Sequence, residues 1–369
     1  MSENPLRVLV AGGGVAALES VLALRSLAGD RVALELLAPG ADFAHRPYSV
    51  RSPFTGEPAP QITFDRTDVI HHRGALAEVD SGRHEVRTTD GGRLPYDRLI
   101  VAVGAQPVDG VPGATLFRGP VSAGAVEGAL ERAGDRVIFT APAKSTWSLP
   151  VYELALLAAH ERPDGPELLV VTAEPRPLDL FGRTASDAVA RLLVRAGVGF
   201  VGGGAPTEVV DDALLLHDGR LIAADTVIAL PRLRGRTIAG LPADDDGFIP
   251  IDEHARIPGV LDVYAAGDII AGPVKQGGLA AQQADAAAEA IAAEAGAPVE
   301  PRPYRPVLRG LLLTGDAPLY MRKSLEDKDV LARPVRSFAP DRTSRSPLWW
   351  PSEKIVGRYI TGYLAGGRA

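Results

Sequence analysis

Two glycine-containing segments, far apart in the chain, carry residue types that bind phosphate and sugar groups. The first, residues 8–20, begins with an apolar run and passes through Gly12 and Gly14 into a helix-forming stretch from Val15. Gly12 permits a tight turn, Gly14 lets the backbone approach a pyrophosphate, and small Ala17 keeps the helix close to the strand. Phosphate oxygens would meet free amides at the helix N-terminus. The segment predicts a dinucleotide site, although such turns also occur without a ligand.

The second segment has the same order of elements. An apolar strand, Val260–Ala266, ends in Gly267 and Asp268, whose carboxylate would accept hydrogen bonds from sugar-like hydroxyls. Lys275 then precedes an alanine-rich helix expected over residues 279–295, and the N-terminus of that helix is a second positive end. The alternative is a surface turn followed by a packing helix.

Together with residues 99–107, a strand ending in a small-residue turn, these motifs resemble those of the two-dinucleotide-binding-domain flavoproteins. That family includes pyridine nucleotide-disulfide reductases, type II NADH dehydrogenases and sulfide:quinone oxidoreductases. The resemblance spans roughly residues 6–298 and implies bound FAD, with Asp268 on the ribityl chain. Lys275 and the second helix N-terminus would stabilise negative charge on the N1–C2=O edge of a reduced flavin. The candidate FAD-binding residues are Gly12, Gly14, Val15, Ala16, Ala38, Arg46, Leu76, Ala102, Gly104, Gly267, Asp268, Gln276, Gly277 and Leu279.

One position departs from the family pattern. The family usually has an acid at the end of the second strand, where it holds the adenosine ribose. Here the strand Val32–Leu37 ends in Ala38 and Pro39, and Glu35 lies inside the strand. We expect the Glu35 side chain to point elsewhere.

The alternation of strands and helices predicts an α/β protein with two Rossmann-like doubly wound domains and a short C-terminal cap. The predicted parts are a first FAD-binding segment over 1–112, a second Rossmann-like domain over 113–230, the rest of the FAD-binding domain over 231–298 and a cap over 299–369.

Composition excludes several functions. The net charge of −7 argues against nucleic acid as a partner, and no apolar run is long enough to span a membrane. The N-terminus lacks the basic start of a secretory signal, so the cytoplasm is the expected location. The chain has no cysteine, so neither thiol–disulfide chemistry nor a cysteine zinc site can operate within it. The seven histidines show no metal-binding spacing, and no metal is expected.

The first turn of the second domain, Thr140–Ser148, contains no glycine. Side chains with Cβ atoms obstruct the close approach of a pyrophosphate, so conventional NAD(P) binding is disfavoured. In this respect the chain is similar to the sulfide:quinone oxidoreductase branch. Lys144 and Ser145 leave open an unusual phosphate-binding loop.

The helix after that turn carries Pro150–Ala155, which resembles a family stretch whose glutamate projects toward the flavin. Glu153 is therefore a candidate catalytic carboxylate that relays a proton, and Lys275 is the second catalytic candidate. The alternative for Glu153 is a structural one, because a glutamate in the first turn of a helix also stabilises the helix dipole.

Near the C-terminus, apolar residues recur with helical spacing from Ile355 to Leu364, which predicts an amphipathic helix. Trp349 and Trp350 would suit a membrane interface, but few basic residues accompany them. We therefore favour packing of this stripe on the protein's own core or on a dimer mate.

These observations predict a FAD-dependent oxidoreductase that transfers two electrons through flavin N5. The predicted acceptor is a quinone or similar small molecule, in a pocket formed by the flavin, Glu153, Lys275 and the C-terminal aromatic residues. Two alternatives stay open: an NAD(P)H-dependent reductase with an atypical nucleotide loop, and a catalytically idle flavoprotein used for sensing or interaction.

Overall fold

The computed structural model describes residues 4–325 and 341–366 of the chain. Its core contains two parallel five-stranded sheets, which confirms the predicted α/β class. The first sheet has the order β20-β9-β1-β2-β5. Its strands are β1 (Leu6–Ala11), β2 (Val32–Ala38), β5 (Ile70–Arg73), β9 (Arg98–Val101) and β20 (Val263–Ala265).

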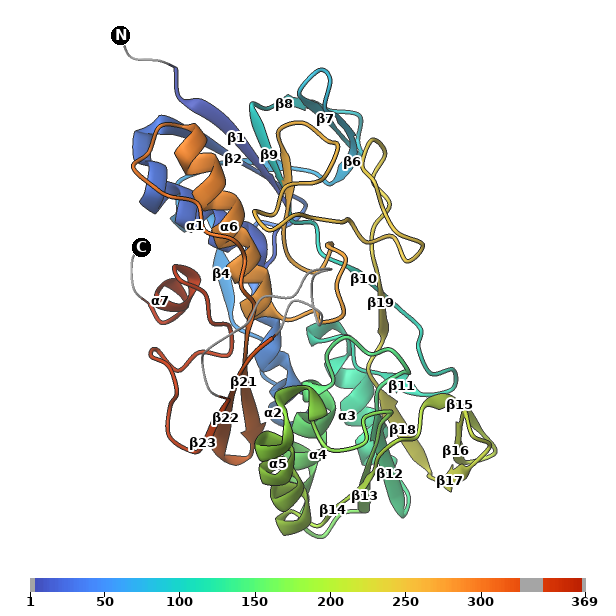
Figure 1. The fold of residues 1–369 in the computed structure, drawn as a ribbon. Helices are drawn as coiled ribbons and strands as arrows, with labels where there is room; N and C mark the ends of the chain where they lie inside the picture. Colours follow the sequence, from blue (N-terminus) through green and yellow to red (C-terminus); the bar gives the residue numbers. More distant parts are fainter. Residues whose placement is uncertain (1–3, 326–340, 367–369) are drawn as a thin grey trace.

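Helices α1 (Val15–Ala28) and α6 (Gly277–Glu294) lie side by side against the first sheet (Figure 1). Half of the residues of α6 are alanine, and these small side chains let the helix pack closely on α1. The central strands β1 and β9 are buried on both faces of the sheet. Their buried residues are therefore all apolar.

The second sheet has the order β11-β18-β12-β13-β14. Its strands are β11 (Thr115–Leu116), β12 (Arg136–Thr140), β13 (Glu167–Val171), β14 (Val198–Val201) and β18 (Thr226–Ala229). Helices α3 (Ala123–Glu131), α4 (Leu149–Glu161) and α5 (Arg183–Arg195) accompany it. An antiparallel ribbon of β10 (Gln106–Val108) and β19 (Arg232–Arg234) carries the chain from the first sheet to the second and back (Figure 1).

Three small antiparallel sheets complete the first two units. They are formed by β3 (Asp42–Ala44) with β4 (Gln61–Thr63), by β6 (Leu76–Asp80), β7 (Glu85–Thr88) and β8 (Arg93–Pro95), and by β15 (Pro206–Val210), β16 (Ala213–Leu216) and β17 (Leu221–Ala223). A short helix, α2 (Ser52–Thr55), contacts α3 and α4.

The C-terminal part forms a three-stranded antiparallel sheet and a short helix. The elements are β21 (Val307–Thr314), β22 (Asp316–Ser324), β23 (Arg342–Ser344) and α7 (Ile360–Leu364). Strand β21 packs against α4, and apolar residues of β21 and β22 join the core around that helix. The sheet therefore covers the helix that follows the glycine-free turn.

The prediction for Glu35 agrees with its position in the structure. Its carboxylate lies 2.6 Å from His72 Nε2, whereas the adjacent His71 contacts the carbonyl oxygen of Ala38 at 3.1 Å. The two histidine side chains point to opposite sides of β5, as successive side chains of a strand do.

The amphipathic helix predicted from Ile355 is wrong in extent, because α7 begins only at Ile360. Residues before it are held in an irregular conformation by side-chain hydrogen bonds. Ile355 and Ile360 are fully buried in the core around α1 and α6, so the stripe packs on the protein itself.

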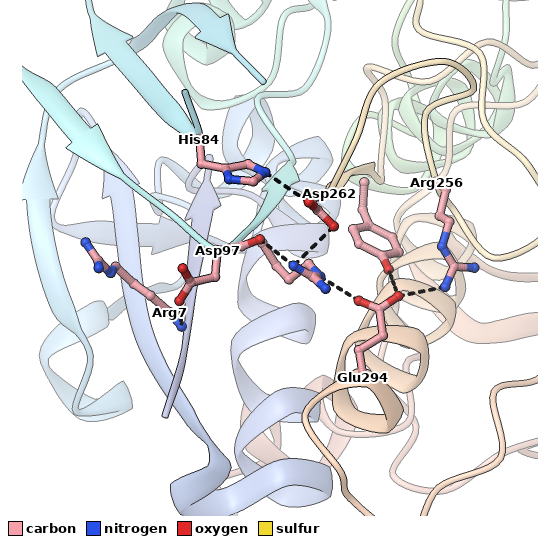
Figure 2. Close-up of polar contacts among 8 residues, drawn as sticks. Arg7, His84, Asp97, Arg256, Asp262 and Glu294 are labelled. Carbon is pink, nitrogen blue, oxygen red and sulfur yellow. Dashed lines mark hydrogen bonds and ion pairs between the residues drawn. The ribbon is translucent and has the colours of Figure 1, made fainter. Parts of the chain in front are cut away.

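Figure 2 shows a polar network at the end of α6 that is remote from the glycine turns. Glu294, the last residue of the helix, accepts hydrogen bonds from Arg98 at 2.6 Å and from Arg256 and Tyr264 at 2.9 Å each. Arg98 also lies 3.1 Å from Asp262, which contacts His84 at 2.9 Å. Because a carboxylate at a helix C-terminus opposes the helix dipole, these donors are needed to hold Glu294 charged.

We predict that Glu294→Gln lowers the free energy of unfolding by about 1 kcal/mol at neutral pH, a modest value because the network is partly exposed. Burial raises the pKa of Glu294, but hydrogen bonds from Arg98 and its other partners outweigh burial and hold the pKa below its usual value. The stabilisation is therefore present at neutral pH and is lost as the pH falls through the lowered pKa.

Urea unfolding of the variant and the wild type at neutral and acidic pH measures this effect. Glu167→Gln, which removes an exposed partner of Arg136, is the control and should stay within about 0.5 kcal/mol of the wild type. A difference between Glu294→Gln and the wild type that is as large in acid as at neutral pH would contradict the prediction.

Candidate cofactor and redox site

Gly12 closes the turn after β1 in a conformation that excludes other residues. Its φ is 141°, and a Cβ atom there would lie 2.0 Å from the carbonyl oxygen of Ala102. The Gly12 amide donates to Leu37 O at 2.8 Å, and the Ala102 amide donates to Ala11 O at 2.7 Å. The ends of β1, β2 and β9 therefore meet at this glycine.

Gly14 precedes the first turn of α1 and has no side-chain cap. No atom lies within 4 Å of a Cβ atom built on Gly14, so its missing side chain leaves a cradle over the helix N-terminus. Gly104, in the turn after β9, has a φ of 70° and the same open surroundings. The backbone amides of Val15 and Ala16 begin the helix beside this cradle.

The two glycine segments lie together in the structure. A Cβ atom on Gly267, whose φ is 86°, would lie 3.1 Å from the Cβ of Ala16. A Cβ atom on Gly277 would lie 3.6 Å from Val15 Cγ2. The N-termini of α1 and α6 are therefore neighbours, and one ligand can lie against both.

Asp268 and Lys275 are the charged groups of the second segment. Burial raises the pKa of Asp268, while the cations of Lys275 and Arg46 act against this rise. Burial lowers the pKa of Lys275 to about 8, against the opposing effects of Asp268 and Asp244. The Lys275 ammonium donates to Ile270 O and lies 3.9 Å from the centre of the Phe248 ring. It is thus a fixed positive charge.

Ala38 lies beside the first glycine turn, because a Cβ atom on Gly13 would lie 3.3 Å from the Cβ of Ala38. Ala38 is the last residue of β2, and its carbonyl accepts a hydrogen bond from the Gly74 amide at 3.3 Å. Leu76 begins β6 shortly afterwards, and Gly74 lies between β5 and β6.

Two predicted contact residues are engaged inside the protein. The Gln276 side chain caps α6 by accepting from the Leu279 amide at 2.9 Å, and it donates to Arg309 O at 3.1 Å. Leu279 is 1% exposed and packs in the core. Both residues position the start of α6, and Gln276 also lines the pocket described below.

A pocket of about 250 Å³ joins the two sheets and the C-terminal part. Its apolar wall includes Phe117, Trp147 and Leu149. Its charged lining residues are Arg46, Arg118, Glu153, Lys275, Arg309 and Lys354. Trp349 and Trp350 do not line it, so the predicted C-terminal aromatic wall is wrong. Lys354 and Ile355 contribute in their place, because the turn after the tryptophans brings these two residues inward.

Glu153 and Lys354 form a buried ion pair in the pocket wall. Lys354 Nζ lies 2.6 Å and 2.7 Å from the two carboxylate oxygens, and Glu153 also accepts from the Leu313 amide at 2.9 Å. The two residues are 1% and 7% exposed. Burial raises the pKa of Glu153 and lowers the pKa of Lys354, so burial favours transfer of the shared proton to the carboxylate.

Other polar residues surround this pair. Tyr48 lies under Lys354, whose ammonium is 5.9 Å from the ring centre. His45 stacks edge to face on Tyr48 at 4.7 Å, and burial together with Lys354 lowers the pKa of His45 to about 4. His45 is therefore neutral at physiological pH. No sequence spacing indicates this cluster, since Glu153 and Lys354 come from distant segments.

The C-terminal segment reaches the pocket because Glu19 of α1 holds it. The Glu19 carboxylate accepts hydrogen bonds from the backbone amides of Tyr359 and Ile360 at 3.0 and 2.5 Å. The Asp285 carboxyl of α6 contacts Glu19, and Asp285 Oδ1 is buried without another partner among the described residues. Because Glu19 already accepts from two amides, Asp285 is the member that keeps a proton.

The glycine-free turn of the second sheet is exposed at Ala143 and Lys144. Lys144 adopts a φ of 66° in this turn, and Pro150 stands in the first turn of α4. Glu174, which follows β13, accepts a hydrogen bond from Tyr152 at 2.7 Å. Burial raises the pKa of Glu174 despite this bond and one from Ser148. Sequence analysis did not identify Glu174.

Two further properties concern the described residues only. No group of three or more His, Asp or Glu side chains in these ranges is arranged to hold a metal ion. None of the helices in the same ranges is both long and apolar enough to cross a membrane.

We predict that Asp285→Asn flattens the pH dependence of stability. Burial and the neighbouring Glu19 raise the pKa of Asp285 to about 9, and Arg358 partly opposes them. Between the unfolded value near 4 and this raised value the folded protein holds a proton that the unfolded chain releases. The free energy of unfolding therefore falls as the pH rises, by at most about 1.4 kcal/mol per pH unit for this proton.

Urea unfolding at pH 5, 7 and 9 measures the slope for the wild type and Asp285→Asn. Asp218→Asn, at an exposed ion pair with Arg220, should keep the wild-type slope. Parallel pH profiles for the wild type and Asp285→Asn would show that Asp285 holds no such proton.

Comparison with known proteins supports the fold and its motifs. The family model of pyridine nucleotide-disulphide oxidoreductases matches residues 152–290. A NADH dehydrogenase-like protein of Mycobacterium tuberculosis is 28% identical over 225 residues, which cover 55% of this chain and 56% of the relative. The chain thus spans about half the length of this relative. The ferredoxin–NAD(+) reductase component of a p-cumate 2,3-dioxygenase system of Pseudomonas putida is 24% identical over 308 residues, or 74% of this chain and 70% of that protein.

Solved structures show the same fold at low sequence identity. The sulfide:quinone oxidoreductase from Aquifex aeolicus has a TM-score of 0.79 at 17% identity and covers 92% of this chain and 87% of its own. A putidaredoxin reductase in complex with putidaredoxin has a TM-score of 0.67 at 20% identity, with 87% and 82% covered. In its glycine motifs, its Rossmann-like sheets and these relatives, the chain is similar to the pyridine nucleotide-disulfide oxidoreductase superfamily.

Proposed function

We propose that this protein is an FAD-dependent oxidoreductase that delivers two electrons to a small acceptor of the quinone type. The observation that carries the proposal is the buried Glu153–Lys354 pair in the wall of a pocket that also contains Arg46, Lys275 and Gly277. The pocket thus places the segments that we propose to contact the flavin beside a source of protons.

The residues fit FAD along its length. The cradle at Gly14 and the N-terminus of α1 suit the pyrophosphate, because helix amides and the positive end of the dipole favour an anion there. Asp268 suits the ribityl hydroxyls, and Lys275 with the N-terminus of α6 suits the pyrimidine side of the ring. When bound, FAD supplies two-electron redox chemistry.

The Glu153–Lys354 pair supplies what quinone reduction needs besides electrons, which is protons. Burial weakens the preference of both groups for their charged forms, so a proton moves between them at low cost. Because both groups line the pocket, either can donate to an acceptor oxygen there. The Leu313 amide keeps the Glu153 carboxylate oriented during this transfer.

A disulfide route is closed within this chain, because it contains no cysteine to act as the thiolate nucleophile. The proposed electron path therefore runs from the flavin directly to the acceptor. In this direct transfer of electrons the chain would be similar to quinone reductases and would differ from the disulfide-reducing members of the superfamily.

NADH is the second candidate for the electron donor. The names of the relatives favour it, since they are a NADH dehydrogenase-like protein and a ferredoxin–NAD(+) reductase. The absence of glycine from the turn at residues 140–148 argues against it, because Cβ atoms there obstruct the close approach of a pyrophosphate. We therefore propose a donor other than NAD(P)H.

Anaerobic titration of the purified protein tests the cofactor and the donor. The protein should carry FAD and be yellow. NADH or NADPH should leave the visible flavin band unchanged within minutes. Sulfide is tested in the same way as an alternative donor. Rapid bleaching by NADH would establish the second candidate. A colourless protein that does not take up FAD would contradict the proposed function as a whole.

We predict that Glu153→Gln lowers the rate of quinone reduction about 100-fold, since a general acid typically contributes this much. The variant also leaves Lys354 buried without its partner, which costs about 3 kcal/mol of stability. The double variant Glu153→Gln with Lys354→Met removes both charges, and it should recover most of this stability while remaining slow.

The measurement is the anaerobic reoxidation of photoreduced protein by menadione, followed at the visible flavin band. Photoreduction makes the result independent of the natural donor. Glu174→Gln removes a different buried carboxylate at α4 and should react at the wild-type rate. A double variant that is stable and as fast as the wild type would show that the pair is only structural.

A further inference from the structure

Three arginines face one another across the C-terminal sheet. Arg309 of β21 is the register partner of Arg322 of β22, and Arg322 is the partner of Arg342 of β23. Side chains at directly opposed positions of antiparallel strands project from the same face, about 5 Å apart at Cβ. Like charges in such positions repel, so this row costs stability.

No acid compensates this charge within the described residues. Neither Arg309, Arg322 nor Arg342 forms an ion pair there, and the Nε of Arg322 is buried without a hydrogen-bond partner. Burial lowers the pKa of Arg309, and the neighbouring Arg322 lowers it further. A charged group that is removed from water without a partner has a large desolvation free energy. The row of arginines is therefore suited to bind an anion.

The row ends at the pocket. Arg309 lines it, next to Gly310 and Leu311 of the same strand. The backbone carbonyl of Arg309 accepts from the Gln276 side chain, so the backbone at Arg309 is held beside the start of α6. Exposed Arg342 lies at the other end of the row, toward solvent.

Three of the other cations in the pocket already have partners, and the charge of Arg46 acts on the Asp268 carboxyl. Lys354 is paired with Glu153, exposed Arg118 is paired with Asp109, and the Lys275 ammonium is held by Ile270 O. Arg309 is therefore the cation of the β21 wall that a ligand can neutralise. An arginine fork binds a planar carboxylate through two parallel hydrogen bonds.

We propose that Arg309, supported by the field of Arg322, binds the acidic group of the small aromatic redox substrate. The substrate is then an anionic molecule, such as a quinone that carries a carboxylate or sulfonate, and Arg309 determines this specificity. This inference rests on the proposed function of the pocket, but its binding test does not require flavin chemistry.

The binding test is isothermal titration calorimetry of the protein as purified with 2-naphthoate and with its neutral analogue 2-naphthamide. The wild type should bind 2-naphthoate at least about tenfold more tightly, the range of a hydrogen bond to a charged group. Arg309→Gln should abolish this difference. Lys323→Gln changes the residue that follows Arg322 and is paired with Leu308, so its side chain lies on the other face and the preference should remain.

A thermal unfolding measurement separates this role from a structural one. Because Arg309→Gln removes a repulsion, it should leave the melting temperature unchanged or raise it. A lower melting temperature together with retained preference for 2-naphthoate would assign Arg309 to the fold and overturn the proposal. Equal binding of the two naphthalenes by the wild type would overturn it as well.

A redox arm links the binding to turnover. Photoreduced wild type and Arg309→Gln are each reoxidised by 1,2-naphthoquinone-4-sulfonate and by neutral 1,2-naphthoquinone. The variant should lose at least about tenfold in rate with the sulfonate and less than twofold with the neutral quinone. If the variant instead shifts the flavin potential and slows both quinones equally, the arginines serve the flavin's own charge and the proposal fails. If the protein carries no flavin, the proposed function fails while the calorimetric result still decides the role of Arg309.

Discussion

The close approach of α1 and α6 is the contact on which the rest of the site depends. It brings the glycine turn after β1 and the one after β20 to the same place, with Gly267 against Ala16 and Gly277 against Val15. Small residues are required on both sides, because a methyl group at Gly267 would already press on Ala16. The alanines of α6 extend this contact along the helix, so the packing that forms the core also aligns two helix N-termini.

The same helix pair fixes the C-terminal segment through Glu19 and Asp285. A carboxylate buried between two helices is costly unless it receives hydrogen bonds, and the amides of Tyr359 and Ile360 provide them. This docking places Lys354 opposite Glu153 and completes the pocket wall. The chemistry proposed for the pocket therefore depends on polar contacts that lie outside it.

The sequence predicts much of this arrangement where local pattern determines structure. The strand and turn at Gly12 and the second segment around Gly267 follow from spacing and hydropathy, and the structure brings the two segments together. Glu153 is expected from the resemblance of residues 150–155 to a family stretch, and it lies in the pocket wall with Gly277. The prediction was wrong where distant partners decide. The helix expected from Ile355 is replaced by an irregular segment because Glu19, which no periodicity reveals, binds its backbone.

The same limit applies to individual side chains. Gln276 is predicted to contact a cofactor, and in the structure its side chain also caps α6 and donates to β21, two roles that no motif reveals. The partnership of Glu153 with Lys354 and the row of arginines across β21, β22 and β23 depend on strand register and chain docking. Neither property is encoded in a short motif.

The order in which the pocket residues occur along the chain has a consequence for biosynthesis. The walls are drawn from segments between Arg46 and Ile355, so many of their contacts join residues that are synthesised far apart in time. Contacts of such large sequence separation form late, because loop closure must precede them. The first glycine turn and its helix can fold while the chain is still on the ribosome, whereas the complete redox pocket exists only after the residues around Lys354 have emerged and docked.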